Sequence, residues 1–250
     1  MKSIRAAVFT LGFFLLLSAE VIALRPSSGF SLPDSVEEMT LKYRVVKGLI
    51  VLPVTINDSI EVNLILDTGC RNLILFGKQF SELFRIHPGK PVVFSGLGSG
   101  KPVTGVLSLG NKVSIHPVLG SQIPVVITNN NLFARFDDVH GVIGYDIFLR
   151  FEIELNAAKR TITFRPANKV SPPVGYTHVN LRVVDARPII QSELFESRKK
   201  GRKMDLMIDT GSSLGLLLKT TNVSQYGTRL KRVLGIGFNG PLSGYETITQ

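Results

Sequence analysis

The 250-residue sequence contains few of the residues that build covalent or metal-based scaffolds. It has one cysteine, Cys70, which excludes a disulfide within the chain, and its four histidines lack the spacing of metal ligands. Acidic residues are also few, 19 against 29 lysines and arginines, so the formal net charge is +10. No nucleic-acid-binding module and no alternation of basic and aromatic residues accompanies this charge, so we expect no nucleic-acid partner. We expect no cofactor either. The stability of the fold must come from a hydrophobic core, which a hydrophobic content of 44% can supply.

Two copies of a short motif organise the chain. The segments are Ile65-Leu66-Asp67-Thr68-Gly69 and Met207-Ile208-Asp209-Thr210-Gly211, and their aspartates are 142 positions apart (209 minus 67). In each copy apolar residues precede the aspartate and a second apolar run follows it, at 73–75 and at 214–218. This pattern predicts a buried strand that ends in a carboxylate, a tight turn and then another apolar strand.

Paired carboxylates are suited to acid–base chemistry. A carboxylate buried in apolar surroundings is costly unless it is protonated or partnered, and two adjacent carboxylates tend to share one proton. One can then act as general base on a water while the other is a general acid toward a carbonyl oxygen. A threonine hydroxyl can tie one loop to its twin, and glycine permits close backbone approach.

The two motifs resemble those of the aspartic peptidases, in which two Asp-Thr/Ser-Gly loops meet at a pseudo-twofold axis. The resemblance, over residues 42 to 250, is closest to exported bacterial proteins with two retropepsin-like units, many of which carry a C-terminal PDZ domain. It implies an all-β, two-lobed acid-protease fold. It also implies Asp67 and Asp209 as catalytic groups, with supporting roles for Thr68, Gly69, Thr210, Gly211 and Ser212. Cys70 stands where Ser or Ala commonly follows the first triplet, and its thiol is a poorer donor than the Ser212 hydroxyl.

A glycine-rich segment follows the first motif. Gly96, Leu97, Gly98 and Gly100 lie between two strand-like runs, 92–94 and 103–109, which predicts a flexible hairpin tip. Its place after the Asp loop favours a flap that closes over bound substrate. A nucleotide-binding loop is excluded, because no Lys-Ser/Thr pair and no helical pattern follows the glycines.

The first lobe has a closing segment that the second lacks. Val142, Ile143 and Gly144 resemble the apolar-apolar-Gly segment that completes the psi-shaped crossing beside an Asp loop in aspartic peptidases. Gly144 comes 77 positions after Asp67 (144 minus 67), whereas the sequence continues for 41 positions after Asp209 (250 minus 209). We therefore expect an incomplete second lobe in which the apolar residues of 214–218 are less covered than those of 73–75.

The chain divides into five expected segments. A positive start, an apolar run over 6–17 and the small-residue site Val21-Ile22-Ala23 predict a signal peptide over 1–23, cleaved after Ala23, and hence an exported protein, periplasmic, in the cell envelope or secreted. Without the signal we expect no stable membrane insertion. Residues 24–40 are expected to be a flexible lead-in, 41–167 the first lobe, 168–176 a linker and 177–250 the partial second lobe. The basic run 198–203 is interpreted as a solvated turn.

These patterns predict an aspartic endopeptidase that acts on peptide or protein substrates through Asp67 and Asp209. One alternative is a non-catalytic peptide-binding protein on the same scaffold. Another is a single catalytic lobe that works as a homodimer through Asp67. A nucleophilic Cys70 is disfavoured, because no histidine forms a recognisable motif with it.

Overall fold

The structure, a computed structural model, describes residues 28–129, 136, 138–167, 174–195, 201–219 and 230–246. These residues are almost entirely β, which confirms the predicted fold class. The expected signal peptide, residues 168–173 of the linker and residues 198–200 of the basic turn lie outside the described part of the chain. None of the described helices is long and apolar enough to cross a membrane.

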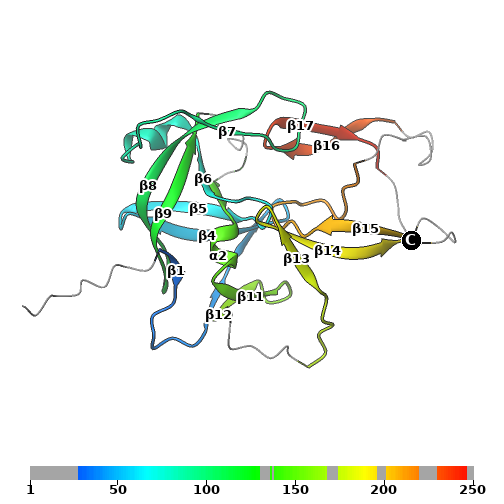
Figure 1. The fold of residues 1–250 in the computed structure, drawn as a ribbon, viewed down its shortest axis with the longest axis horizontal. Helices are drawn as coiled ribbons and strands as arrows, with labels where there is room; N and C mark the ends of the chain where they lie inside the picture. The colour runs from blue at the N-terminus through cyan, green and yellow to red at the C-terminus, as the bar shows by residue number, and fades with distance from the viewer. Residues whose placement is uncertain are drawn as a thin grey trace, which may run out of the picture.

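In its described residues the first lobe has twelve strands and two short helical segments, many of which are labelled in Figure 1. They are β1 (Gly29–Ser31), β2 (Met39–Lys42), β3 (Arg44–Val46), β4 (Leu49–Ile56), β5 (Ile60–Leu66), β6 (Leu73–Phe76), the 3-10 helix η1 (Lys78–Glu82), β7 (Val92–Phe94), β8 (Val103–Ile115), β9 (Val118–Thr128), β10 (Gly141–Ile143), α2 (Tyr145–Phe148), β11 (Phe151–Asn156) and β12 (Thr161–Pro166).

Nine of these strands form one sheet that closes on itself. The order is β1-β9-β6-β10-β5-β4-β8-β7, with β3 on β4, and the additional β8–β9 pairing completes a ring of β9, β6, β10, β5, β4 and β8. A closed ring leaves few free strand edges and surrounds one apolar interior. Strand β6 is buried at all four positions, because it lies between β9 and β10 within this ring.

The hairpin of β4 and β5 delivers the first Asp loop. Its turn, Asn57-Asp58, has positive φ angles of 50° and 62°, the conformation that a two-residue hairpin favours and that Asn and Asp tolerate. The three residues before Asp67 are fully or almost fully buried apolar side chains. The aspartate is therefore fixed at the end of a rigid core strand.

Part of the expected lead-in is ordered, which corrects the boundary near residue 41. Strand β1 pairs with β9, and Phe30 is 3% exposed in the main core. Strand β2 starts at Met39, also a core residue, and pairs with β12 next to β11. Single apolar residues thus anchor this polar, aperiodic stretch to the lobe. Sequence periodicity does not reveal such isolated contacts.

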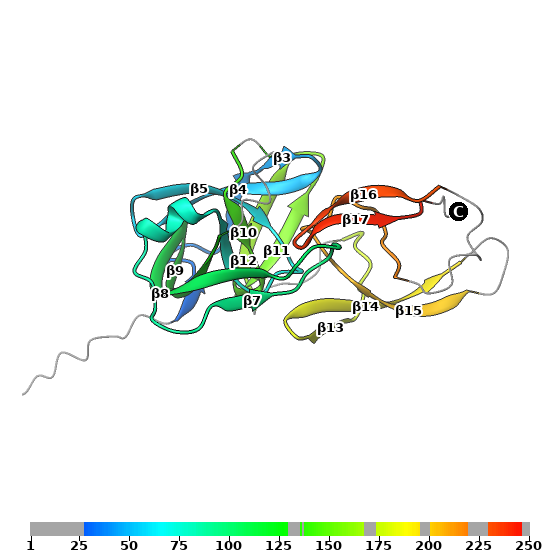
Figure 2. The ribbon, with the colours of Figure 1, turned by 90° about the horizontal axis from the view of Figure 1, so that it is seen from above.

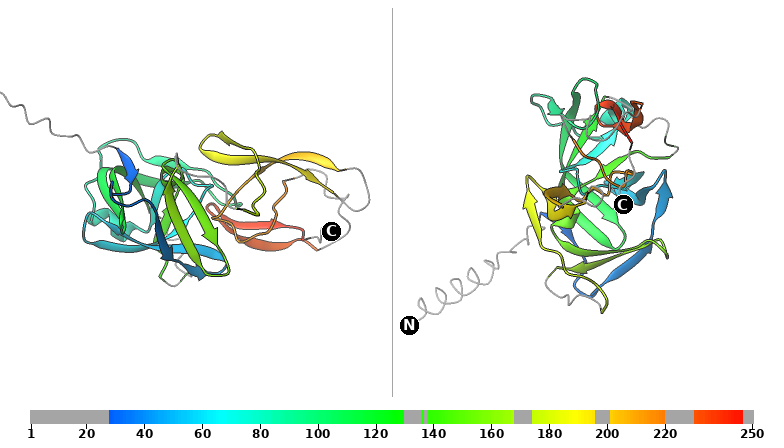
Figure 3. Two further views of the ribbon diagram at one scale, coloured as in Figure 1. Left: turned by 90° about the horizontal axis from the view of Figure 1, so that it is seen from below. Right: turned by 90° about the vertical axis from the view of Figure 1, so that its right-hand side faces the viewer.

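The described part of the second lobe contains five strands, β13 (Leu181–Val184), β14 (Arg187–Leu194), β15 (Arg202–Met207), β16 (Arg232–Gly237) and β17 (Gly240–Gly244). The sheet β13-β14-β15 repeats the succession β3-β4-β5, and β16 pairs with β17 as a separate hairpin. Both sets extend in the same direction away from the first lobe (Figures 2 and 3). Because β15 begins at Arg202, the last two residues of the predicted basic turn are strand.

The predicted apolar strand over 214–218 does not form. Among the described residues this segment belongs to no sheet, whereas its counterpart β6 is held between two neighbouring strands. Leu216 is 43% exposed, against 2% for Ile74 at the equivalent position of β6. The predicted difference in coverage is confirmed, and the missing strand pairing is its cause.

Candidate active site between the two lobes

The two Asp-Thr-Gly loops lie against one another. Asp67 directly follows β5, and its N–H donates to the carbonyl of Ile143 in β10 at 2.9 Å. Asp209 follows β15 by two residues, with the N–H of Ile208 held by the carbonyl of Pro188 at 2.9 Å. Two hairpins therefore bring together aspartates that are far apart in the sequence, one in each half of the chain.

Reciprocal threonine contacts join the loops. The hydroxyl of Thr68 donates to the carbonyl of Ile208 at 2.6 Å and accepts from the N–H of Thr210 at 3.0 Å. The hydroxyl of Thr210 donates to the carbonyl of Leu66 at 2.7 Å and accepts from the N–H of Thr68 at 3.1 Å. Each hydroxyl thus makes two bonds across the interface, which fixes the relative position of the two carboxylates.

The glycines of the motifs make room for the opposite aspartate. A Cβ atom on Gly211 would collide with Cγ of Asp67, and one on Gly69 would lie 3.1 Å from Oδ1 of Asp209. Each glycine N–H also donates to the aspartate of its own loop, at 2.7 Å to Asp67 and 2.9 Å to Asp209. A side chain at Gly211 would push the carboxylates apart.

The pKa of Asp67 is raised to about 7. Burial is the largest cause, followed by the negative charge of Asp209, and a hydrogen bond with Asp209 adds to both. Backbone N–H groups of Gly69 and Cys70 act in the opposite direction but do not offset them. Asp67 therefore holds its proton at pH values where an ordinary aspartate is ionised.

The residues after the two triplets, Cys70 and Ser212, each make a hydrogen bond within their own turn. The Cys70 thiol donates to the carbonyl of Asn72 at 3.3 Å, and burial raises its pKa to about 12, so the sulfur stays a neutral thiol. The Ser212 hydroxyl accepts from the N–H of Leu214 at 3.2 Å. Both groups stabilise their own turns, and the structure records no bond from the Ser212 hydroxyl to Asp209 within its described residues.

The segment over 142–144 closes the first Asp loop. Strand β10 runs parallel to β5 and antiparallel to β6, so it lies between the strands on either side of Asp67. A Cβ on Gly144 would collide with the carbonyl oxygen of Cys70, and the N–H of Tyr145 donates to that oxygen at 2.8 Å. The glycine is required because the chain passes directly against the loop.

The glycine-rich segment forms a hairpin tip that meets the second lobe. Strands β7 and β8 pair antiparallel, and residues 95–102 connect them. The tip contacts the turn between β16 and β17, where the N–H of Asn239 donates to the carbonyl of Leu97 at 2.8 Å and the N–H of Gly100 to the carbonyl of Asn239 at 2.5 Å. The Asn239 side chain accepts from the N–H of Gly96 at 2.9 Å. We call 95–102 the first flap and 237–241 the second flap.

The second flap was missed in the sequence, although a signal for it exists. Gly98 and Gly240 come at the same offset from their aspartates, 31 positions after Asp67 (98 minus 67) and 31 positions after Asp209 (240 minus 209). Both glycines have positive φ, 121° and 97°. The two flaps are therefore equivalent parts of one repeat, and equal spacing from the Asp loops would have identified the pair.

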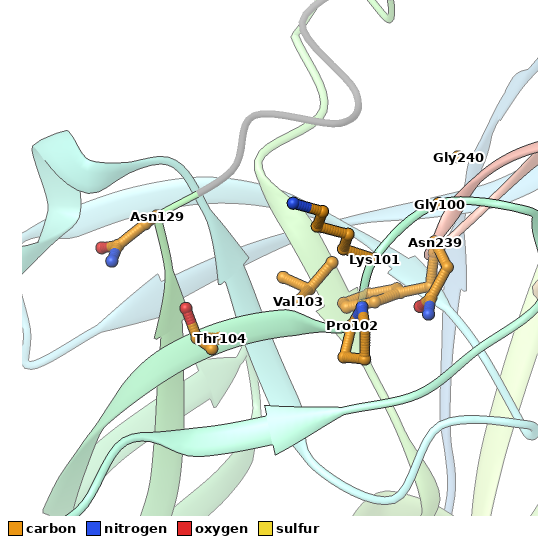
Figure 4. A pocket seen from close by; sticks show the side chains of 9 residues that line it. Gly100, Lys101, Pro102, Val103, Thr104, Asn129, Asn239 and Gly240 are labelled. Carbon is orange, nitrogen blue, oxygen red and sulfur yellow. The ribbon is translucent and has the colours of Figure 1, made fainter.

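Two cavities lie beside the flaps. A cavity of about 370 Å³ is lined by residues 100–102 of the first flap, the start of β8, Asn129 and the second flap, and neither aspartate borders it (Figure 4). A larger one of about 1130 Å³ extends from the first flap to residues 214–219, directly after the Asp209 loop. In the described part of the chain no cluster of three His, Cys, Asp or Glu residues could hold a metal ion.

One family model and two solved structures are similar to parts of this chain. Residues 52–147 match the family model described as aspartyl protease. Among solved structures, a retropepsin-like aspartic protease from Rickettsia conorii is similar at 13% identity and a TM-score of 0.37, over 55% of this chain and 93% of that one. An aspartic proteinase from Irpex lacteus is similar at 13% identity and a TM-score of 0.45, over 71% of this chain and 64% of that one. No curated protein sequence gives a significant match. Residues 52–147, which carry Asp67 and β10, are thus similar to the aspartyl protease family.

Proposed function

We propose that the protein is an aspartic endopeptidase that hydrolyses peptide bonds with a water activated by Asp67 and Asp209. The observation that carries the proposal is the contact between the two carboxylates, with the pKa of Asp67 raised to about 7 by burial and by the charge of Asp209. The match of residues 52–147 to the aspartyl protease family supports the reaction class. A pair that holds one proton is what this chemistry needs.

The proposed roles follow from the proton that Asp67 holds below about pH 7. Asp209 takes a proton from the water as its oxygen attacks the carbonyl carbon, and Asp67 gives its proton to the carbonyl oxygen. In the tetrahedral intermediate, Asp209 passes its proton to the amide nitrogen and the C–N bond breaks. Asp67 recovers its proton from the hydroxyl that becomes the new carboxylic acid, which restores the starting state.

The substrate in this proposal is an extended peptide that lies between the Asp loops and the two flaps. The flap tips are joined by backbone hydrogen bonds of 2.5 and 2.8 Å, so they must part for the peptide to enter. When closed they cover the reacting bond and exclude bulk water, which strengthens the electrostatic interactions of the carboxylate pair.

Substitution of each aspartate by asparagine tests the proposal. With the full chain and a mixture of unstructured peptides, we expect Asp67→Asn and Asp209→Asn each to lower kcat/KM by at least about 10² to 10⁴. Asp58→Asn is the matched control, because Asp58 lies in an exposed hairpin turn whose φ of 62° asparagine tolerates. Equal hydrolysis by all three variants would contradict the proposal.

The same experiment separates the alternatives. Peptide binding without hydrolysis by the unsubstituted chain would indicate a non-catalytic binding protein. Hydrolysis that survives Asp209→Asn, is lost in Asp67→Asn and falls steeply on dilution would indicate a homodimer through Asp67.

A further inference from the structure

The two flaps cover two equivalent apolar hollows. In the first lobe the hollow is bounded by Ile74, Phe76 and Val92, which belong to the smaller of the two apolar clusters of the core or pack against it. Adding the repeat offset of 142 gives Leu216, Leu218 and Leu234, and all three line the larger cavity in the second lobe. The same three positions of the repeat therefore build an apolar hollow in each lobe.

The hollow in the first lobe is filled by Phe238 from the second flap. The Phe238 ring lies 5.9 Å from the ring of Phe76 at an interplanar angle of 63°, and 5.9 Å from the ring of Phe94 at 60°. Both are edge-to-face contacts, the arrangement that aromatic pairs prefer. The neighbouring Asn239 joins the same turn to the first flap by hydrogen bonds, which hold the ring in place while the flaps are closed.

In the described part of the chain no aromatic flap side chain enters the equivalent hollow of the second lobe, because the counterpart of Phe238 is Gly96 (238 minus 142). Gly96 has no side chain to insert, and a Cβ atom there would lie 2.6 Å from Cβ of Phe238. The second lobe has a cavity of about 1130 Å³ that reaches from the first flap to Leu214, next to the Asp209 turn. This one difference between the repeats thus places a phenyl ring in the first hollow and, among the described residues, none in the second.

Resting on the proposed peptidase function, we infer that Phe238 blocks the subsite of the first lobe, so that only the second-lobe hollow, lined by Leu216, Leu218 and Leu234, takes a large apolar side chain of the peptide. The phenyl ring already seated in the equivalent hollow shows which chemistry such a site accepts. The cleft then recognises an apolar residue on one side of the cleaved bond only.

Profiling of cleavage positions tests this inference. A peptide mixture digested by the unsubstituted chain should give a preference for Phe or Leu on one side of the cleaved bond. Phe238→Gly should add a preference on the other side. The double variant Gly96→Phe with Phe238→Gly moves the ring to the other flap, so the apolar preference should move to the other side of the cleaved bond. A side chain at Gly96 can be accommodated in this variant, because removal of Phe238 also removes the 2.6 Å contact that would oppose it.

Two controls separate specificity from folding. Phe238→Leu keeps an apolar group in the first hollow and should retain the original one-sided profile. Phe195→Gly removes an exposed phenylalanine that lies outside β14 and should change nothing. If Phe238 only stabilised the fold, Phe238→Gly would lower cleavage of all peptides alike and leave the profile unchanged, and that outcome overturns the inference.

A binding arm keeps the inference apart from the proposed function. Fluorescence anisotropy with Asp67→Asn would compare a labelled Ala-Ser peptide with peptides that carry one phenylalanine or two on opposite sides of the centre. We expect one phenylalanine to improve binding at least about tenfold and the second to add little until Phe238→Gly is introduced. If no variant cleaves, the proposed function fails, and the binding data alone test the inference. Equal gains in peptide affinity from both phenylalanines without Phe238→Gly would overturn the inference.

Discussion

Asp67 is the residue whose titration should control the activity. Its pKa is raised to about 7 by burial and by the charge of Asp209, and in the proposed mechanism it must carry a proton. We therefore expect kcat/KM to fall as the pH rises through about 7, since the general acid is then lost. A pH–rate profile measures this, and constant activity between pH 6 and 9 would contradict the assignment of Asp67 as the acid.

The same shift should affect stability. In the unfolded chain Asp67 loses its proton near the ordinary aspartate pKa of 3.8, whereas the folded chain keeps it to about 7, so between these pH values the folded state binds more protons. The free energy of unfolding should therefore decline through this group as the pH rises from about 4 to 7. Asp67→Asn lacks the titration and should show a flatter dependence in urea unfolding. An identical slope in both proteins would show that the pKa is not raised.

Thr68 is the other residue on which the site depends. It is 7% exposed, and its hydroxyl makes two hydrogen bonds across the lobe interface. Thr68→Val keeps the shape but leaves the Ile208 carbonyl and the Thr210 N–H without this partner, which should cost about 1–3 kcal/mol in the free energy of unfolding. Thr68→Ser retains the hydroxyl and should cost less. Equal losses in the two variants would assign the effect to packing instead.

At the scale of elements, the segments that follow the two Asp loops have similar apolar sequences but differ in whether neighbouring strands hydrogen-bond to them. The segment 73–76 becomes β6 because β9 and β10 hydrogen-bond to it on both sides. The equivalent 214–218 has the same apolar character, yet Leu216 and Leu217 are 43% and 37% exposed and the segment joins no sheet among the described residues. Apolar character alone does not make a strand when no partner pairs with it.

This difference predicts the order of local opening. Strand β13 is exposed at all four positions and β15 is exposed at four of six, whereas β6 is wholly buried. Hydrogen exchange should therefore open residues after about 175 before the first lobe, because few apolar contacts oppose local unfolding there. Mass-spectrometric exchange of the full chain measures both halves at once. Equally slow exchange in β6 and β15 would contradict the prediction.

At the scale of the whole molecule, the two lobes contact each other at two sites. The Thr68 and Thr210 network joins them beside the carboxylates, and the flap tips join them again at Leu97 and Asn239. The first contact fixes the carboxylate pair and the second covers the approach to it. In the proposed enzyme the first contact must persist while the second opens.

Export is the remaining prediction at this scale. The positive start, the apolar run over 6–17 and the site at Val21-Ile22-Ala23 lead us to propose signal cleavage after Ala23. N-terminal sequencing of protein from the cell envelope or the medium should begin at Leu24. Recovery of the chain with Met1 intact from the cytoplasm would refute the proposal.

The sequence by itself determined the local features: two Asp-Thr-Gly loops at the ends of apolar strands, a hairpin over 92–109 and an almost wholly β chain, because alternation, turn residues and repeated spacing are encoded locally. It predicted that residues 142–144 pass beside the first loop, and β10 lies between β5 and β6. Only the tertiary structure decided that Phe30 and Met39 dock as core residues, that 214–218 stays outside any sheet and that Phe238 enters the opposite lobe. These outcomes depend on which partner a side chain or strand meets at a distant point of the chain, and no local pattern specifies that partner.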